Sequence, residues 1–359
     1  MPTLYVGTYT RKEGHVDGKG KGIYAFSFDE ASGALSPLGV TEGVGINPSY
    51  IFGSSSTLYA VNECNEPSKL RPGEETGFVV ALRINKDATL TEISRHESGG
   101  AFACHVALSA NGDVVSVANY AGGSLTLFPV QSDGSLAAES DHHRFSDASM
   151  VIPDRQEASH IHSTAWTPTG LVAADLGNDR VVQYTLDASS KTLKDEEYLV
   201  RPPGSGPRHF ALLPKRGVGY VVSELDNTVG VYPMDAATGR LAAEPLQSIS
   251  TLPEGYAGPP ALAADIHVSS CGRFVFASTR FHHSIASYKI LPDTRLELVE
   301  IIPTRGDTPR DILVYKDFVL AVNQDTDSLD VFRVDGETGK LTYTGNSVDC
   351  PSPASLFII

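Results

Sequence analysis

The feature that most constrains the fold of this chain is a repeat in its sequence. Each copy opens with a polar cluster and an apolar strand, continues through two strands that end in polar residues, and finishes with a Gly-x-Leu segment. The clearest copies begin at Cys104, His162 and Arg208, and others begin near Ser49, Ala264 and Arg310. Their spacing of roughly 44 to 58 residues is typical of the four-stranded blades of a β-propeller.

Short runs of alternating apolar and polar residues, with almost no helical periodicity, indicate an all-β protein. The chain ends supply a seventh copy, because residues 351–359 resemble a first strand, while residues 4–8, 23–28 and 35–40 resemble the following three. Pairing between these ends would close the ring and leave no open sheet edge. We therefore predict a single domain over residues 1–359, a seven-bladed β-propeller with four-stranded blades. Two stacked β-sandwiches are the alternative, but sandwiches do not require one repeat to be divided between the two ends of the chain.

The predicted fold places particular residues around its axis. The first strand of each blade lines the central channel, so residues just before first strands and at the ends of second strands meet on one face. The first predicted ring consists of Ser49, Cys104, His162, Arg208, Ala264, Arg310 and Ala354. The second consists of Thr8, Glu63, Asn119, Asp175, Glu224, Thr279 and Asn323, with Arg280 directly after its member. Four histidines and an aspartate follow or flank the first ring, namely His105, His209, Asp265, His160 and His267.

Arginine and histidine carry most of the information in these rings, because neither residue has a role in forming turns. Asn119, Asp175 and Asn323 are explained as ordinary turn formers. Each single histidine is also explained as a hydrogen-bonded core residue, and each arginine as part of a salt bridge between blades. The combination of both residue types with a glutamate in equivalent positions favours a functional site.

The chemistry of these side chains suits an anionic substrate. Arg208, Arg280 and Arg310 carry planar guanidinium groups that bind carboxylate or phosphate through two hydrogen bonds and offset charge on a carbonyl oxygen. A carboxylate beside a histidine moves protons, and Glu224 with His162 suits the activation of water. A metal ion is not expected, because several guanidinium groups would repel a cation.

Composition and charge narrow the partners. The formal net charge of −15 argues against nucleic acid and anionic membrane surfaces as partners, because those surfaces attract basic patches. The sequence opens without a basic and apolar leader, and no stretch approaches the roughly 18 apolar residues of a membrane span. We therefore expect a cytoplasmic protein. The four cysteines are far apart and are predicted to be free thiols.

Four segments resemble the signature stretches of the lactonase family of seven-bladed β-propellers. They are Gly206-Pro207-Arg208-His209, Ser223-Glu224-Leu225-Asp226-Asn227, Ala264-Asp265-Ile266-His267 and Thr308-Pro309-Arg310. The family includes bacterial propeller-type 6-phosphogluconolactonases and fungal 3-carboxy-cis,cis-muconate cyclases. The resemblance extends over essentially the whole chain.

The resemblance implies metal-independent chemistry, without a cofactor, on a small anionic lactone. In the cyclase branch the acting residues are a histidine, two arginines and a glutamate, which by motif correspond to His162, Arg208, Arg280 and Glu224. We favour hydrolysis of 6-phosphoglucono-δ-lactone to 6-phosphogluconate, with the closure of a carboxymuconate to its lactone as the alternative. Thr279 stands where the phosphogluconolactonase branch is expected to have Asp, which counts against that branch. The expected substrate-binding residues are Arg310, His209, His267, Asp265 and His105.

Two functions of other classes stay open at this point. A non-catalytic interaction platform is compatible with any propeller, since fold does not fix function. An oxidoreductase-type propeller would hold a cofactor or a metal. The sequence assigns neither an oligomeric state nor a role to Cys104.

Overall fold

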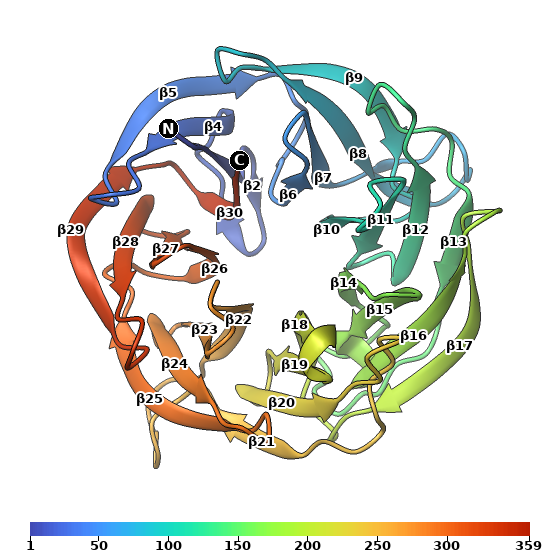
Figure 1. The fold of residues 1–359 in the computed structure, drawn as a ribbon. Helices are drawn as coiled ribbons and strands as arrows, with labels where there is room; N and C mark the ends of the chain where they lie inside the picture. The colour runs from blue at the N-terminus through green and yellow to red at the C-terminus, as the bar shows by residue number, and fades with distance from the viewer.

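Seven antiparallel sheets of four strands surround a central channel in the computed structural model, which describes residues 1–359 (Figure 1). The strands of each blade run in order from the channel to the rim. Blades 1 to 3 consist of β6 (Ile51–Gly53), β7 (Thr57–Pro67), β8 (Glu75–Ile84) and β9 (Leu90–Glu97); β10 (Ala103–Leu108), β11 (Val114–Asn119), β12 (Ser124–Pro129) and β13 (Asp141–Arg144); and β14 (Ile161–Trp166), β15 (Gly170–Asp175), β16 (Arg180–Asp187) and β17 (Thr192–Val200). Blades 4 to 6 consist of β18 (Pro207–Leu213), β19 (Val218–Ser223), β20 (Thr228–Pro233) and β21 (Gln247–Ser250); β22 (Leu262–Val268), β23 (Phe274–Arg280), β24 (Ser284–Ile290) and β25 (Leu296–Pro303); and β26 (Pro309–Tyr315), β27 (Phe318–Asn323), β28 (Ser328–Val334) and β29 (Leu341–Asp349). The predicted seven-bladed propeller is confirmed.

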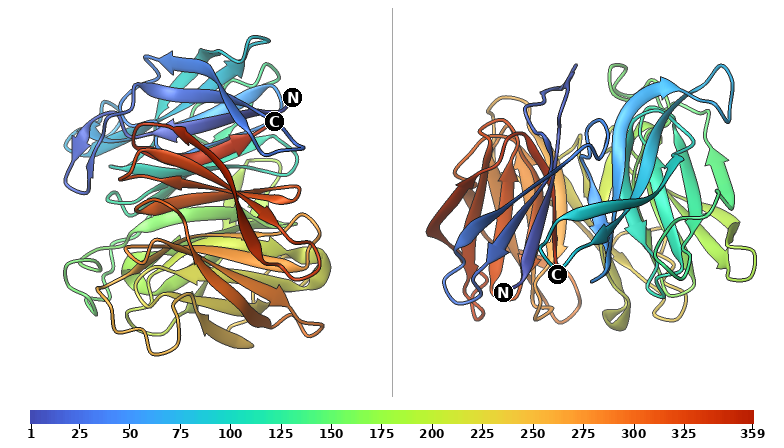
Figure 2. Two further views of the ribbon diagram at one scale, coloured as in Figure 1. Left: turned by 90° about the vertical axis from the view of Figure 1, so that its left-hand side faces the viewer. Right: turned by 90° about the horizontal axis from the view of Figure 1, so that it is seen from above.

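Blade 7 is assembled from both ends of the chain. Its inner strand is β30 (Pro353–Ile358), and β1 (Thr3–Thr8), β4 (Gly22–Phe28) and β5 (Leu35–Glu42) follow it outward. Strands β30 and β1 are antiparallel, with Leu356 opposite Val6. The two termini lie together, as Figure 2 shows. This pairing is the ring closure that the split repeat predicts, and it leaves no inner strand unpaired.

The hydrophobic core is divided among the spaces between neighbouring blades. In the largest cluster, Val222 and Val229 of blade 4 pack with Ala277 and Ala286 of blade 5. A blade covered on both faces needs apolar residues on both sides of its middle strands. Accordingly, every residue of β27 is buried. This two-sided burial explains why the apolar and polar alternation of the sequence is weakest in the second strands.

Side-chain contacts between consecutive inner strands form a closed belt around the channel, which we call the inter-blade belt. Asp265 accepts a hydrogen bond from the backbone N–H of Ile312 (3.1 Å), and Asp311 accepts one from that of Leu356 (2.7 Å). His209 Nδ1 lies 2.8 Å from Asp265 Oδ1. The other links join Ser163 Oγ to the Arg208 carbonyl, Ser355 Oγ to the Ser49 carbonyl (2.7 Å), the Thr164 N–H to His105 Nδ1 (3.4 Å) and the Tyr50 ring to the His105 ring (4.3 Å between centroids).

Few elements lie outside the seven sheets. They are the single-turn 3₁₀ helices η1 (Leu176–Asn178) and η2 (Pro214–Arg216) and a small hairpin of β2 (Lys12–Glu13) and β3 (Val16–Asp17), inserted between β1 and β4. Figure 1 shows this hairpin near the centre of the ring. No helix of this structure has the length and apolar character that crossing a bilayer requires.

The ring closure generates a stability prediction. Leu356 is 6% exposed and packs in the cluster that joins blades 6 and 7. We expect Leu356→Ala to lower the free energy of unfolding by about 2–4 kcal/mol, because it removes buried methyl groups and leaves a cavity. Urea denaturation followed by circular dichroism measures the change.

The matched control is Leu298→Ala on the outer strand β25, where the side chain is 42% exposed. That change should lower the free energy of unfolding by less than about 0.5 kcal/mol. Equal losses in the two variants would contradict the importance of the closing strand.

Candidate functional site

A β-bulge at the start of the inner strands determines which side chains face the axis. The register between first and second strands shifts at Cys104, His162, Arg208 and Arg310, and in blade 7 at Ala354. A bulged residue has no partner of its own in the second strand, and its side chain is redirected. Two residues before the first-ring position, five blades have a positive φ, at Asn47 (45°), Phe102 (53°), Gly206 (59°), Thr308 (60°) and Ser352 (44°). In these blades the first-ring residue is therefore positioned by a local irregularity of the backbone.

The second ring differs from the sequence alignment by one residue in two blades. The side-chain amides of Asn62, Asn119 and Asn323 each donate a hydrogen bond to a carbonyl of the connection that enters their blade. Asn62, not Glu63, is thus the equivalent of Asn119 in the second ring. Glu63 and Glu224 both lie one residue after the second-ring position of their blades. The residues of this later position are Tyr9, Glu63, Tyr120, Leu176, Glu224, Arg280 and Gln324, and all of them except Tyr9 and Leu176 line the cavity described next.

A cavity of about 490 Å³ lies at this end of the channel. Four of the predicted site residues line it, namely His162, Glu224, Arg280 and Arg310. The other polar residues that the cavity exposes include His15, Glu63, Arg155, Gln324 and Asp325, and aromatic side chains at its wall are Phe102, Tyr120 and Phe281. A volume of this size suits a small metabolite.

Three arginines converge on the carboxylate of Glu224, which is 2% exposed. Arg208 Nε lies 2.9 Å and Arg280 Nη2 2.7 Å from Glu224 Oε2, while Arg155 contacts Oε1. Arg208 also donates to the carbonyl of Ala264 and lies behind the cavity wall. The Nε of Arg280 is buried without a hydrogen-bond partner. Arg280 also lines the cavity, so its charge faces a bound molecule.

The charges of this cluster determine what its members can do. Burial alone would raise the pKa of Glu224, but Arg280, Arg155 and Arg208 hold that pKa well below its usual range. Burial lowers the pKa of Arg280 to about 9, so its guanidinium stays charged at neutral pH. A carboxylate with so low a pKa is a weak base. Glu224 consequently holds the arginines in place, and the proton-transfer role expected for it does not suit this environment.

His162 supplies the cavity with a nitrogen base. Burial, and then the charge of Arg208, hold the pKa of His162 well below its usual range, so the imidazole is neutral. Its Nδ1 is buried without a hydrogen-bond partner. Cys104 lies beside it and donates from Sγ to the His162 carbonyl (3.2 Å). Burial raises the pKa of the Cys104 thiol, so Cys104 is a protonated wall residue, not a nucleophile.

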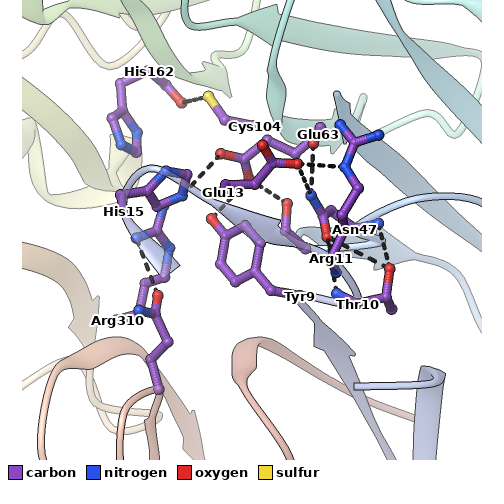
Figure 3. Close-up of polar contacts among 12 residues, drawn as sticks. Tyr9, Thr10, Arg11, Glu13, His15, Asn47, Glu63, Cys104, His162 and Arg310 are labelled. Atoms are coloured by element: carbon purple, nitrogen blue, oxygen red, sulfur yellow. Dashed lines mark hydrogen bonds and ion pairs between the residues drawn. The ribbon is translucent and has the colours of Figure 1, made fainter. Parts of the chain in front are cut away.

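The hairpin between β1 and β4 adds His15 to the cavity (Figure 3). Asn47 anchors the hairpin, because its Oδ1 accepts the backbone N–H of Arg11 (2.9 Å) and its Nδ2 donates to Glu13 Oε1 (3.0 Å). His15 Nε2 then lies 3.9 Å from Glu63 Oε1. Glu63 Oε2 in turn accepts hydrogen bonds from the hydroxyl groups of Tyr9 (2.8 Å) and Ser49.

The remaining predicted substrate-binding residues lie outside the main cavity. His105, His209 and Asp265 are members of the inter-blade belt, and His209 faces a smaller hollow behind His162. His267 lies further along β22, with Nε2 3.0 Å from Asp265 Oδ2 and 35% of its side chain exposed. The structure thus separates these four residues from the arginines of the cavity.

One group of side chains has the composition of a metal site. Ligand atoms of Asp265, His267 and Asp311 lie within 4.8 Å of one another. Asp265 is already occupied, since it accepts from Ile312 and contacts both His209 and His267. This group lies apart from the residues that line the cavity.

Two cavity residues, His15 and Arg155, stand in segments that no other blade repeats. His15 belongs to the inserted hairpin, and Arg155 to the connection 145–160, the longest between two blades. An alignment of repeats cannot find such residues. The only signal for Arg155 was an arginine in an unusually long connection.

Comparisons with known proteins agree with the geometry. A family model described as "Lactonase, 7-bladed beta-propeller" matches residues 3–358. The chain is 33% identical over 357 residues to a 6-phosphogluconolactonase of Bacillus subtilis, which covers 97% of this chain and 96% of the relative. It is 34% identical over 346 residues to an uncharacterized protein of Lactococcus lactis, with 94% of each covered. A solved periplasmic gluconolactonase of Pseudomonas aeruginosa is 31% identical, with a TM-score of 0.88 over 100% of this chain and 99% of that one.

The arginines should differ sharply in their effect on stability. Arg208 is 2% exposed and pairs with Glu224, so Arg208→Ala leaves a buried carboxylate with fewer partners. We expect the free energy of unfolding to fall by about 3–5 kcal/mol. Arg310 is only partly buried, with one hydrogen bond to Gln324 (3.3 Å) and a contact with the Tyr9 ring. Arg310→Ala should lower the free energy of unfolding by about 1 kcal/mol or less.

Urea denaturation of the two variants beside the wild type measures both changes. Equal and small losses would mean that the buried arginine cluster does not stabilise the protein.

Proposed function

The chain belongs to the lactonase family of seven-bladed β-propellers, and on that basis we propose that it hydrolyses 6-phosphoglucono-δ-lactone to 6-phosphogluconate. The observation that carries the proposal is the meeting, in one cavity, of a neutral His162 and a charged Arg280 that is held by Glu224. Ester hydrolysis needs a base for water and a positive group for the carbonyl oxygen. The relative from Bacillus subtilis supports the choice of substrate.

The proposed steps use only side chains of this cavity and water. His162 takes a proton from a water molecule as the water oxygen bonds to the lactone carbonyl carbon. Arg280, held by Glu224, stabilises the negative charge on the carbonyl oxygen. The bond from that carbon to the ring oxygen then breaks, and His162 returns its proton to the leaving oxygen. The product is the open-chain acid, and His162 is neutral again.

Arg310 is the proposed anchor for the phosphate group. Its only hydrogen bond is the long one to Gln324, so most of its donors are free for a ligand. His15 lines the same cavity and would add a second donor. Glu63 and Asp325 also line the cavity and offer acceptors for sugar hydroxyl groups. The two similar proteins described above that carry a functional name are both named as lactonases, and we propose hydrolysis instead of lactone closure.

A comparison of two lactones tests the substrate. Purified protein should hydrolyse 6-phosphoglucono-δ-lactone well above the spontaneous rate and should prefer it to glucono-δ-lactone. Arg310→Ala should raise KM for the phosphorylated lactone about 10- to 100-fold, the equivalent of losing a charged hydrogen bond of about 1.5–3 kcal/mol. KM for glucono-δ-lactone should stay unchanged.

Two outcomes would contradict the proposal. If the wild type prefers the unphosphorylated lactone, its substrate would instead be of the kind named for the Pseudomonas aeruginosa gluconolactonase. If the folded wild type accelerates neither reaction, the proposal that the protein hydrolyses these lactones is wrong.

The pH profile tests the base. Protonated His162 cannot accept a proton, and burial together with Arg208, His209, Arg310 and Arg280 holds its pKa well below 6.5. We therefore expect kcat/KM to stay constant as the pH falls from 7.5 through 6.5, and to decline only at lower pH. His162→Asn should lower kcat by about 10² to 10⁴ and abolish this decline. A half-maximal rate near pH 6.5 in the wild type would argue for a different, solvent-exposed base.

A further inference from the structure

A second, much smaller hollow lies behind His162. Its volume is about 10 Å³, which is the lower limit for holding one water molecule. Both His162 and His209 line it, and so do polar groups of Tyr9, Ser49 and Glu63. A buried water molecule needs two to four polar partners, and this hollow supplies them. His162 lines the main cavity as well, so it separates the two spaces.

Two ring nitrogens at this hollow lack partners. His162 Nδ1 and His209 Nε2 are both buried without a hydrogen bond. The two imidazole rings lie 5.2 Å apart between centroids, at an interplanar angle of 62°. Two buried nitrogens left without partners destabilise a protein unless something bridges them. One water molecule between the rings would satisfy both.

The other nitrogen of His209 settles the direction of the hydrogen bond between His209 and the water molecule. His209 Nδ1 lies 2.8 Å from Asp265 Oδ1. Although burial opposes it, His267 and His209 hold the pKa of Asp265 well below its usual range, so Asp265 is an acceptor. His209 therefore carries its proton on Nδ1. Burial, and then Arg208, lower the pKa of His209 to about 4, so the ring is neutral and its Nε2 is an acceptor.

We propose that one water molecule in this hollow links His162 to His209 and Asp265, and that this chain of hydrogen bonds positions His162 as the base. The water donates to His209 Nε2 and accepts from His162 Nδ1–H. His162 is thereby held in the tautomer that leaves Nε2 without a proton. His209 and Asp265 are positioning residues in this arrangement, since they act through His162. The part that concerns catalysis rests on the proposed hydrolysis.

The chain also stabilises the charge that forms on His162. When Nε2 accepts a proton from the attacking water, the ring becomes an imidazolium with a proton on each nitrogen. Its Nδ1–H then points through the bridging water and His209 toward the ionised Asp265. No proton has to leave His162 by this path, and the proton on Nε2 passes to the leaving oxygen. The arrangement resembles the way a buried aspartate orients a catalytic histidine, with one water and one imidazole inserted.

A purely structural role for His209 and Asp265 is the competing explanation, because both belong to the inter-blade belt. Two replacements of His209 separate the explanations. The amide of His209→Asn keeps a donor for Asp265 but does not reach the hollow. The longer amide of His209→Gln places an oxygen near the position of Nε2, where it accepts from the water, but gives up the contact with Asp265.

The first measurement is the tautomer of His162, read from ¹⁵N chemical shifts of histidine-labelled protein, with His162→Gln to assign the signal. We expect the Nδ1–H tautomer in the wild type and in His209→Gln, and the Nε2–H tautomer in His209→Asn. Ser355→Ala removes a different belt link and should leave the tautomer unchanged. A wild type in the Nε2–H tautomer, or identical behaviour of the two His209 variants, would overturn the proposal.

The second measurement is turnover of 6-phosphoglucono-δ-lactone. His209→Asn should lower kcat by about 10- to 100-fold, a part of the contribution of a general base, with KM unchanged. His209→Gln should lose less of its kcat than His209→Asn, and Ser355→Ala should stay close to the wild type. Asp265→Asn gives a second test of the chain, with thermal denaturation to show that the variants fold. If the wild type hydrolyses no lactone, the proposed function fails, whereas the tautomer still decides whether the water link exists.

Discussion

The constraint on which the rest of the structure depends is the fixed position of seven inner strands around one axis. Each strand is attached to the next by a side chain of the inter-blade belt, such as Asp311 to the backbone of Leu356. One position before the belt, a bulge turns the side chain toward the channel mouth. Belt and site are thus neighbouring positions of the same strand, as in Arg208 and His209. A site built on paired strands is held more precisely than one built on loops.

The buried charges of the site depend on this rigidity. A carboxylate such as Glu224 is stable away from water only when its charge is compensated at short range. Three guanidinium groups compensate it, and they come from blades 4 and 5 and from the connection before blade 3. Glu224 in return keeps Arg280 charged and in place. The polar groups are therefore oriented before any substrate binds, so little reorganisation is needed during the reaction.

The sequence was sufficient for the fold because each blade repeats the same polar and apolar pattern, and because the split copy at the ends has only one way to close. It also placed His162, Glu224, Arg280 and Arg310 around the axis. The alignment of the repeats placed Glu63 and Glu224 one residue too early. It set these charged residues equivalent to asparagines such as Asn119, whose side-chain amides bind the connections between blades.

The sequence did not predict which side chains contact each other between blades. A repeat shows which residues are equivalent, but not that His209 faces Asp265 from the next blade. For this reason His105, His209 and Asp265 were expected in the substrate site, whereas their side chains serve the belt. His15 and Arg155 lie in an insertion and a long connection that have no counterpart in other blades. Only the folded ring shows that these segments reach the cavity.

The assembly of blade 7 from both chain ends has a consequence for biosynthesis. A ribosome makes β1 long before it makes β30, the strand that pairs with the free edge of β1. Until then the nascent chain holds an unpaired edge, of the kind that invites contact with other chains. Tyr9 and His15 also reach the channel mouth only through blade 7. A polypeptide released before its last few residues would hence carry nearly every side chain of the site and still be unable to assemble it.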